Sequence, residues 1–202
     1  MSRRPPKTLK KSIPFFIVEG KTEKNYIENL KNIFNIGVER PKPTKGGNPI
    51  GVLKKAKRII KEKKEYSTFF IWFDLDKIQD KEKFFNLCNQ LKKINIEIFF
   101  VVSAPCTEAF LLGHFETIRE NQLNKECKYF EKKLEEYIPA YKKGNERQIN
   151  KYITKEKINF CIFNYPVKKF NLFCMLYYFF NTKIPDKRKC DYREIYNLKE
   201  IL

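Results

Sequence analysis

The sequence has few of the residues that build metal sites with nitrogen or sulfur ligands. It contains one histidine, His114, and its six cysteines are scattered without a CxxC pair. Zinc sites take cysteine and histidine ligands at short, regular spacings. The sequence therefore argues against a zinc finger or another Cys/His centre.

Long apolar runs are also missing. No segment reaches the ~20 apolar residues of a membrane-spanning helix, and the nearest, 170–180, is shorter and contains Asn171. Residues 1–12 are basic and contain prolines, without the apolar segment of a signal peptide. We therefore expect a cytoplasmic protein with reduced thiols and no membrane contact, beginning with a basic, flexible tail at 1–12.

Positive charge, in contrast, is abundant. The 202 residues include 42 Lys+Arg and 24 Asp+Glu, which gives a formal net charge of +18. Such an excess favours polyanionic partners, with nucleic acid first. The alternative is that a composition rich in Lys, Asn, Ile and Phe reflects an AT-rich genome. Composition alone leaves both explanations open.

Apolar runs alternate with helical patterns along the first half of the chain. Buried strands are predicted at 13–18, 68–73 and 96–102, and a short strand at 35–40. The alternation predicts an α/β fold with a mostly parallel sheet and helices on both faces. We expect a core domain at 13–115 and a helical extension with the C-terminal region at 116–202.

Capping residues suggest where the helices begin. Thr22 is a candidate N-cap, Asn48 followed by Pro49 is a stronger one, and Asp80 is a third. The segment 41–49 between the first two helices is expected to be a loop, whose lysines and Gly46-Gly47 pair could contact phosphate.

Acidic residues follow two of the predicted strands. Glu19 ends the first, and Asp74 and Asp76 end the second as an Asp-x-Asp pair. Because the carboxyl ends of parallel strands share one edge of a sheet, these carboxylates are expected to converge there. Carboxylate oxygens are ligands of hard divalent cations such as Mg²⁺.

Each acidic position also has a structural explanation. Glu23 and Glu108 lie in the first turns of predicted helices, where a negative charge is favourable beside the helix dipole. An aspartate after a strand is often a cap or a turn former. His114 is expected to pack at a helix end.

Three motifs in order carry a resemblance to a known family. They are Glu19-Gly-Lys-Thr-Glu23-x-x-Tyr26, Asp74-x-Asp76, and Ser103-x-Pro-Cys-x-Glu108 with Leu111-Leu-x-His-Phe115. In this arrangement, residues 13–115 resemble the RloB family, bacterial proteins with a TOPRIM-type core found beside phage-defence loci and often beside an AAA- or ABC-type ATPase.

The resemblance implies roles for individual residues. Glu19 would be a metal ligand or general base, and Asp74 and Asp76 would hold Mg²⁺ or Mn²⁺. It also moves Glu23 and Glu108 into the site.

The chemistry that fits these acids is phosphodiester hydrolysis, in DNA or RNA and including tRNA, with Lys21 or Lys77 offsetting charge on the phosphate. The resemblance implies an ATPase partner, and a homo-oligomer is a further expectation. The alternative is a non-catalytic subunit that binds nucleic acid or assembles a defence complex. The aromatic segment 160–180 is expected to form core or a protein interface, with base stacking as the other explanation.

Overall fold

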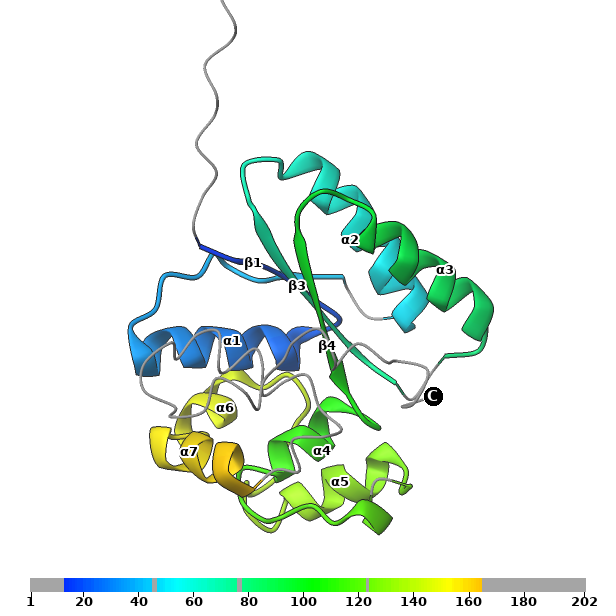
Figure 1. The fold of residues 1–202 in the computed structure, drawn as a ribbon. Helices are drawn as coiled ribbons and strands as arrows, with labels where there is room; N and C mark the ends of the chain where they lie inside the picture. Colours follow the sequence, from blue (N-terminus) through cyan, green and yellow to red (C-terminus); the bar gives the residue numbers. More distant parts are fainter. Residues whose placement is uncertain (1–12, 45–46, 76–77, 123, 165–202) are drawn as a thin grey trace, which may run out of the picture.

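The computed structural model describes residues 13–164 apart from 45–46, 76–77 and 123. Its centre is a four-stranded, all-parallel sheet in the order β2-β1-β3-β4 (Figure 1). The strands are β1 (Phe15–Val18), β2 (Lys42–Pro43), β3 (Thr68–Asp74) and β4 (Glu97–Ser103). The predicted α/β class with a parallel sheet is confirmed.

Helices cover both faces of the sheet (Figure 1). One face packs against α2 (Pro49–Glu62) and α3 (Lys81–Lys92). The helices on the other side are α1 (Lys21–Phe34), α4 (Thr107–Leu112), α5 (Cys127–Leu134), α6 (Glu146–Tyr152) and α7 (Lys155–Asn164), with a 3₁₀ turn at Glu120–Gln122.

The strands are apolar on both sides because both faces are covered. Along β3, Phe69, Ile71 and Phe73 point to the α2–α3 side, whereas Phe70 and Trp72 point to the α1 side. All five are at most 1% exposed. This double burial fixes the register, since a slip of one residue would exchange the two faces.

Two of the three predicted caps are confirmed and one is wrong. Asn48 accepts a hydrogen bond from the Gly51 amide (2.9 Å), and Asp80 accepts one from the Lys83 amide (2.9 Å). Thr22, however, lies inside α1, whose N-cap is Gly20. The Gly20 amide donates to the Glu23 carboxylate (2.9 Å), so the acid in the first turn does the capping that we assigned to the threonine.

The structure also corrects the prediction for the segment between α1 and α2. No strand forms at 35–40, and the two-residue strand β2 lies in the part predicted as loop, paired with Ile17 and Val18 of β1. Val38 belongs to this irregular segment, and its side chain is buried in the hydrophobic core. The apolar residues of 35–40 therefore signalled burial and not a strand.

The described part of the extension is helical, as expected, but broken into short pieces. Phe130 and Leu134 are buried with residues of α1 and α4 in one hydrophobic cluster, and Tyr137 is half-buried against it. Residues 165–202, which hold most of the aromatic segment, lie outside the described residues.

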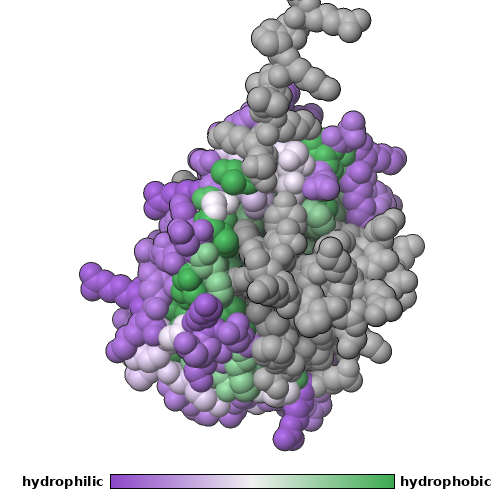
Figure 2. Space-filling view, turned by 60° about the vertical axis from the view of Figure 1, so that its left-hand side comes forward, coloured by the Kyte–Doolittle hydropathy of each residue, from purple (hydrophilic) through white to green (hydrophobic). Residues whose placement is uncertain are grey.

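The face shown in Figure 2 is largely hydrophilic, with hydrophobic side chains gathered in a band among the charged ones. Ile33, Phe34 and Ile36, at the end of α1, are half-buried against the core. Within the described residues, no helix is long and apolar enough to cross a membrane.

Candidate metal and hydrolytic site

Two acids from neighbouring strands meet at the carboxyl edge of the sheet. Glu19 directly follows β1, and Asp74 is the last residue of β3, which pairs with β1. The Asp74 amide donates a hydrogen bond to Glu19 Oε2 at 3.1 Å. Residues 55 positions apart in the chain are therefore in direct contact, at the edge that the sequence indicated.

A single hydroxyl group joins Asp74 to a third acid. Thr107 Oγ1 lies 2.6 Å from Glu23 Oε1 and 2.8 Å from Asp74 Oδ1. A hydroxyl carries one hydrogen, so it donates to only one of these oxygens at a time. The second carboxyl group must carry a proton of its own to bond the hydroxyl, unless a cation compensates the two charges.

Burial makes it costly for Glu23 and Asp74 both to be ionised. Glu23 is 2% exposed and Asp74 is 5% exposed. Burial is the main cause that raises the pKa of Asp74 well above its ordinary value, followed by repulsion from Glu23 and Glu19. Burial also raises the pKa of Glu23, against hydrogen bonds that lower it. In the absence of a cation, the cluster therefore favours bound protons.

The fourth acid, Glu108, is compensated by residues of the extension. Its side chain is fully buried, and its carboxylate accepts hydrogen bonds from Lys143 Nζ (2.9 Å) and the Tyr141 hydroxyl (3.3 Å). Burial opposes the charge of Lys143, but the Glu108 carboxylate outweighs it and raises the pKa of the lysine. Lys143 remains charged, and its side chain is 53% exposed although its amine contacts the buried Glu108 carboxylate.

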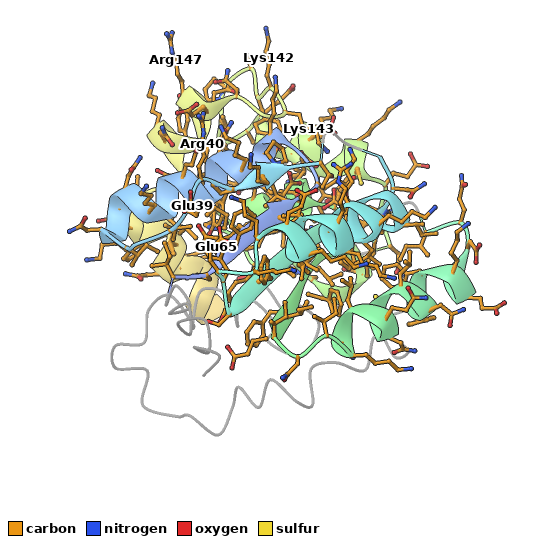
Figure 3. All side chains as sticks on the ribbon, turned by 90° about the horizontal axis from the view of Figure 1, so that it is seen from above. Glu39, Arg40, Glu65, Lys142, Lys143 and Arg147 are labelled. Atoms are coloured by element: carbon orange, nitrogen blue, oxygen red, sulfur yellow. The ribbon has the colours of Figure 1, made fainter. Side chains whose placement is uncertain are left out.

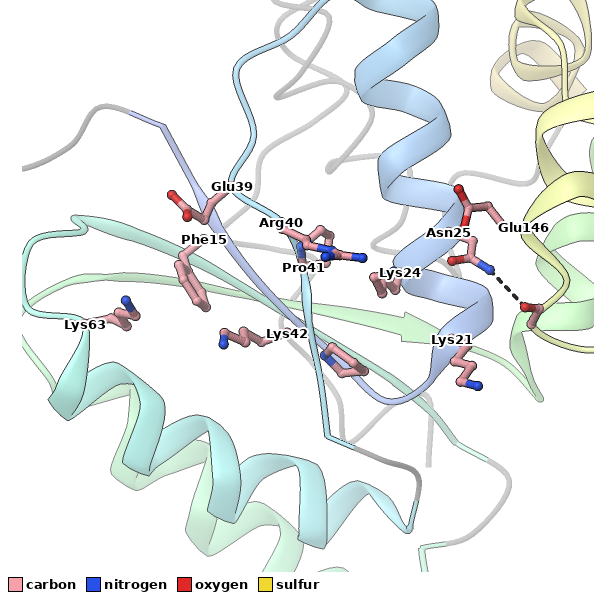
Figure 4. Close-up of a pocket in the computed structure, with 12 residues that line it drawn as sticks. Phe15, Lys21, Lys24, Asn25, Glu39, Arg40, Pro41, Lys42, Lys63 and Glu146 are labelled. Atoms are coloured by element: carbon pink, nitrogen blue, oxygen red, sulfur yellow. Dashed lines mark hydrogen bonds between the residues drawn. The ribbon is translucent and has the colours of Figure 1, made fainter.

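Helix α1 fixes the turn that carries Lys143. The Asn25 side chain donates to the carbonyl of Gly144 (3.0 Å, dashed in Figure 4), and Asn29 donates to the carbonyl of Ile153 (2.8 Å). Gly144 has a φ of +73°, and a Cβ there would lie 2.9 Å from Lys21 Cβ. The turn needs glycine both for its left-handed backbone and for this close approach.

Four of the six predicted site residues come together: Glu19 and Asp74 in contact, Glu23 through Thr107, and Glu108 near enough to raise the pKa of Asp74. Asp76 lies outside the described residues, as does the candidate Lys77.

Lys21 is exposed and lines an adjacent pocket, and among the described residues its amine makes no contact with the carboxylates. Lys143 does contact one of the acids, Glu108, and sequence reasoning missed this lysine. Figure 3 shows Lys142, Lys143 and Arg147 in this part of the extension.

The residues suit a divalent cation in charge and donor type. Among the described residues, Lys143 contacts one of the four carboxylates, Glu108, and carboxylate oxygens are hard ligands. Thr22 adds a buried hydroxyl that has no hydrogen-bond partner in the described chain. Within the described ranges, however, no three His, Cys, Asp or Glu side chains are grouped to hold a metal. A complete ligand set therefore requires Asp76 or a small movement of the acids.

His114 is a structural residue, as its position at a helix end suggested. It is fully buried, with Nε2 2.9 Å from the Tyr26 hydroxyl and Nδ1 3.1 Å from the Phe110 carbonyl. Burial lowers its pKa to about 4, so the imidazole is neutral near pH 7.

Comparison with known proteins identifies the family of the chain. No curated protein and no solved structure matches the chain. The sequence model of the RloB-like protein family matches residues 15–172, a longer stretch than the three motifs cover, and it includes Tyr141 and Lys143. With most of its length matched, the chain belongs to the RloB-like protein family.

Proposed function

We propose that this protein is a nuclease that hydrolyses phosphodiester bonds with the help of Mg²⁺ or Mn²⁺. The observation that supports the proposal most is the contact between Glu19 and Asp74 at the carboxyl edge of the sheet, beside Glu23 and Glu108. Buried acids at such an edge repel one another, and proteins keep costly arrangements of this kind chiefly at functional sites.

The residues of the chain divide the work between them. Glu19 and Asp74, with Asp76, would hold the ion, which when bound polarises the phosphoryl oxygen and lowers the pKa of the attacking water. Thr107 holds the Asp74 carboxylate in place through its hydroxyl. Lys143 would supply an ammonium group beside the acids that offsets the charge developing on the phosphate, and Glu108 with Tyr141 positions this lysine.

The test is cleavage of labelled DNA, RNA and tRNA by the wild type and by Glu19→Ala and Asp74→Ala, with and without Mn²⁺. The proposal expects metal-dependent cleavage that both variants lose while oligonucleotide binding persists. Equal cleavage by all three proteins would refute it, because the activity would then come from elsewhere.

A second candidate is a subunit that binds nucleic acid without cutting it. The net charge of +18 and a pocket rich in lysine beside α1 favour this function. Binding by the wild type without cleavage of any substrate, with or without Mn²⁺, would support it.

On the strength of the family resemblance, we further propose that the nuclease acts in phage defence under the control of an AAA- or ABC-type ATPase. A neighbouring gene for a large P-loop ATPase, and co-purification of its product with this protein, would support that part. If the purified protein cleaves at full rate and no ATPase changes that rate, the control by an ATPase is wrong.

A further inference from the structure

A basic pocket lies next to the acidic cluster but outside it. Its volume is about 730 Å³, and it opens between the start of α1, strand β2 and the turn at Gly144 (Figure 4). Its lining contains five cations against two acids, Glu39 and Glu146. The cations are Lys21, Lys24, Arg40, Lys42 and Lys63.

Part of this positive charge is not neutralised, although Lys63 pairs with Glu65 (3.7 Å). Lys21 and Lys42 are exposed and form no ion pair within the described chain. Lys24 (3.1 Å) and Arg40 (3.2 Å) share the single carboxylate of Glu28. Arg40 is 78% exposed in its side chain while it pairs with Glu28. Lys21 and Lys42 therefore leave the pocket with unpaired positive charge that attracts an anion.

The uncharged lining offers little for reading bases. Phe15, at 1% exposed, presents almost no ring surface on which a base could stack, and Pro41 and Pro43 have no backbone donor. Phosphate contacts by lysine and arginine position a nucleic acid without reading its sequence. The lining thus suits a sugar–phosphate backbone.

Several residues that line the pocket are close neighbours, in the chain, of the residues of the acidic cluster. Lys21 is two residues after Glu19, and Gly144 directly follows Lys143. On the β2 side, Thr44 follows Pro43 and donates a hydrogen bond to the Glu19 carbonyl (3.1 Å). A strand lying in the pocket would therefore be led toward the carboxylates at the start of α1.

We propose that this pocket holds the sugar–phosphate backbone of the nucleic acid, with Lys21 and Lys42 as its principal phosphate contacts. The orientation toward a cleaved bond rests on the proposed nuclease function, whereas the binding itself does not. Because the contacts are to phosphates, binding is independent of base sequence and depends steeply on salt.

The test measures fluorescence anisotropy of labelled oligonucleotides of two unrelated sequences across a salt series, in EDTA. The test variant is Lys21→Ala with Lys42→Ala. The matched control is Lys128→Ala with Lys132→Ala, which removes the same charge from exposed positions of α5 outside the pocket. EDTA prevents cleavage, so the result does not depend on whether the protein is a nuclease.

The proposal expects the slope of log K against log [salt] to fall by about 1.5 in the pocket variant, since each phosphate contact contributes roughly 0.7 to 0.9. If the binding curves converge near 1 M salt, affinity at 0.1 M falls roughly 30-fold, for both sequences alike. The control should stay within about twofold of the wild type. Equal losses in the two double variants, or no loss in either, would overturn the proposal.

Discussion

The Asp74 amide donates to the Glu19 carboxylate across 3.1 Å, which ties the end of β3 to the residue that follows β1. This bond brings together the first acids of two sequence motifs that lie far apart in the chain. It also keeps the negative charge of Glu19 beside the carboxyl group of Asp74, which is already buried and repelled by Glu23. Much of the expected behaviour of the protein follows from that placement.

The first prediction concerns the cation that the extension supplies. Lys143→Ala should lower the rate of cleavage by about 10²- to 10³-fold, because the ammonium group beside the acids would no longer offset charge on the phosphate. Lys143→Arg should retain part of the activity. Lys142→Ala, in the adjacent exposed position, should cleave at the wild-type rate. Equal rates for Lys143→Ala and Lys142→Ala would show that Lys143 has no role in the chemistry.

Removing one buried charge should stabilise the metal-free protein. The folded-state pKa of Asp74 is raised, so stability is fully present below the ordinary pKa of the group, near 4, and falls as pH rises toward the folded-state value. Asp74→Asn should therefore raise the melting temperature at pH 7 in EDTA and remove the stabilisation that Mn²⁺ gives the wild type. A lower melting temperature for the variant in EDTA, with unchanged Mn²⁺ stabilisation, would contradict this account.

The shared hydroxyl of Thr107 should matter more than its methyl group. Thr107→Val leaves Glu23 and Asp74 without their common partner and should cost about 1–3 kcal/mol in the free energy of unfolding. Thr107→Ser keeps the hydroxyl and should lose less. Urea unfolding of the two variants at pH 7 gives the comparison, and a serine variant as unstable as the valine variant would rule out the bridge.

The turn that carries Lys143 provides a backbone prediction. Gly144→Ala meets both a positive φ and a contact of 2.9 Å with Lys21 Cβ, so it should destabilise by more than the ~1 kcal/mol of left-handed strain alone. Gly47→Ala is the matched control, because Gly47 also has a positive φ (+129°) but nothing lies within 4 Å of its added Cβ. Chemical denaturation should rank Gly144→Ala below Gly47→Ala; the opposite order would mean that the close approach is unimportant.

Because His114 is buried, the protein should lose stability in acid. In the unfolded chain, a histidine takes up a proton near pH 6.5, whereas the buried imidazole stays neutral to about pH 4. Stability should therefore fall between these values, by on the order of 3 kcal/mol in all. The difference between the wild type and His114→Gln across this range isolates the effect from the carboxyl groups; a constant difference would contradict it.

The structural features that the sequence predicted correctly depend mostly on residues that are close together in the chain. The caps at Asn48 and Asp80, the buried strands and the edge where Glu19 and Asp74 meet all follow from residues and their neighbours in the chain. The contact between Lys143 and Glu108 could not be predicted in this way, since the two residues are 35 positions apart and meet through a turn fixed by α1. Glu23 was ambiguous for a physical reason: it both caps α1 and contacts the acidic cluster.

The central claim is that acids from separate strands hold one divalent cation. A crystal soaked in Mn²⁺ and measured for anomalous scattering tests it most directly. The account predicts an anomalous peak within bonding reach of the Glu19 and Asp74 carboxylates. A saturated crystal with well-ordered carboxylates and no peak between them would contradict it.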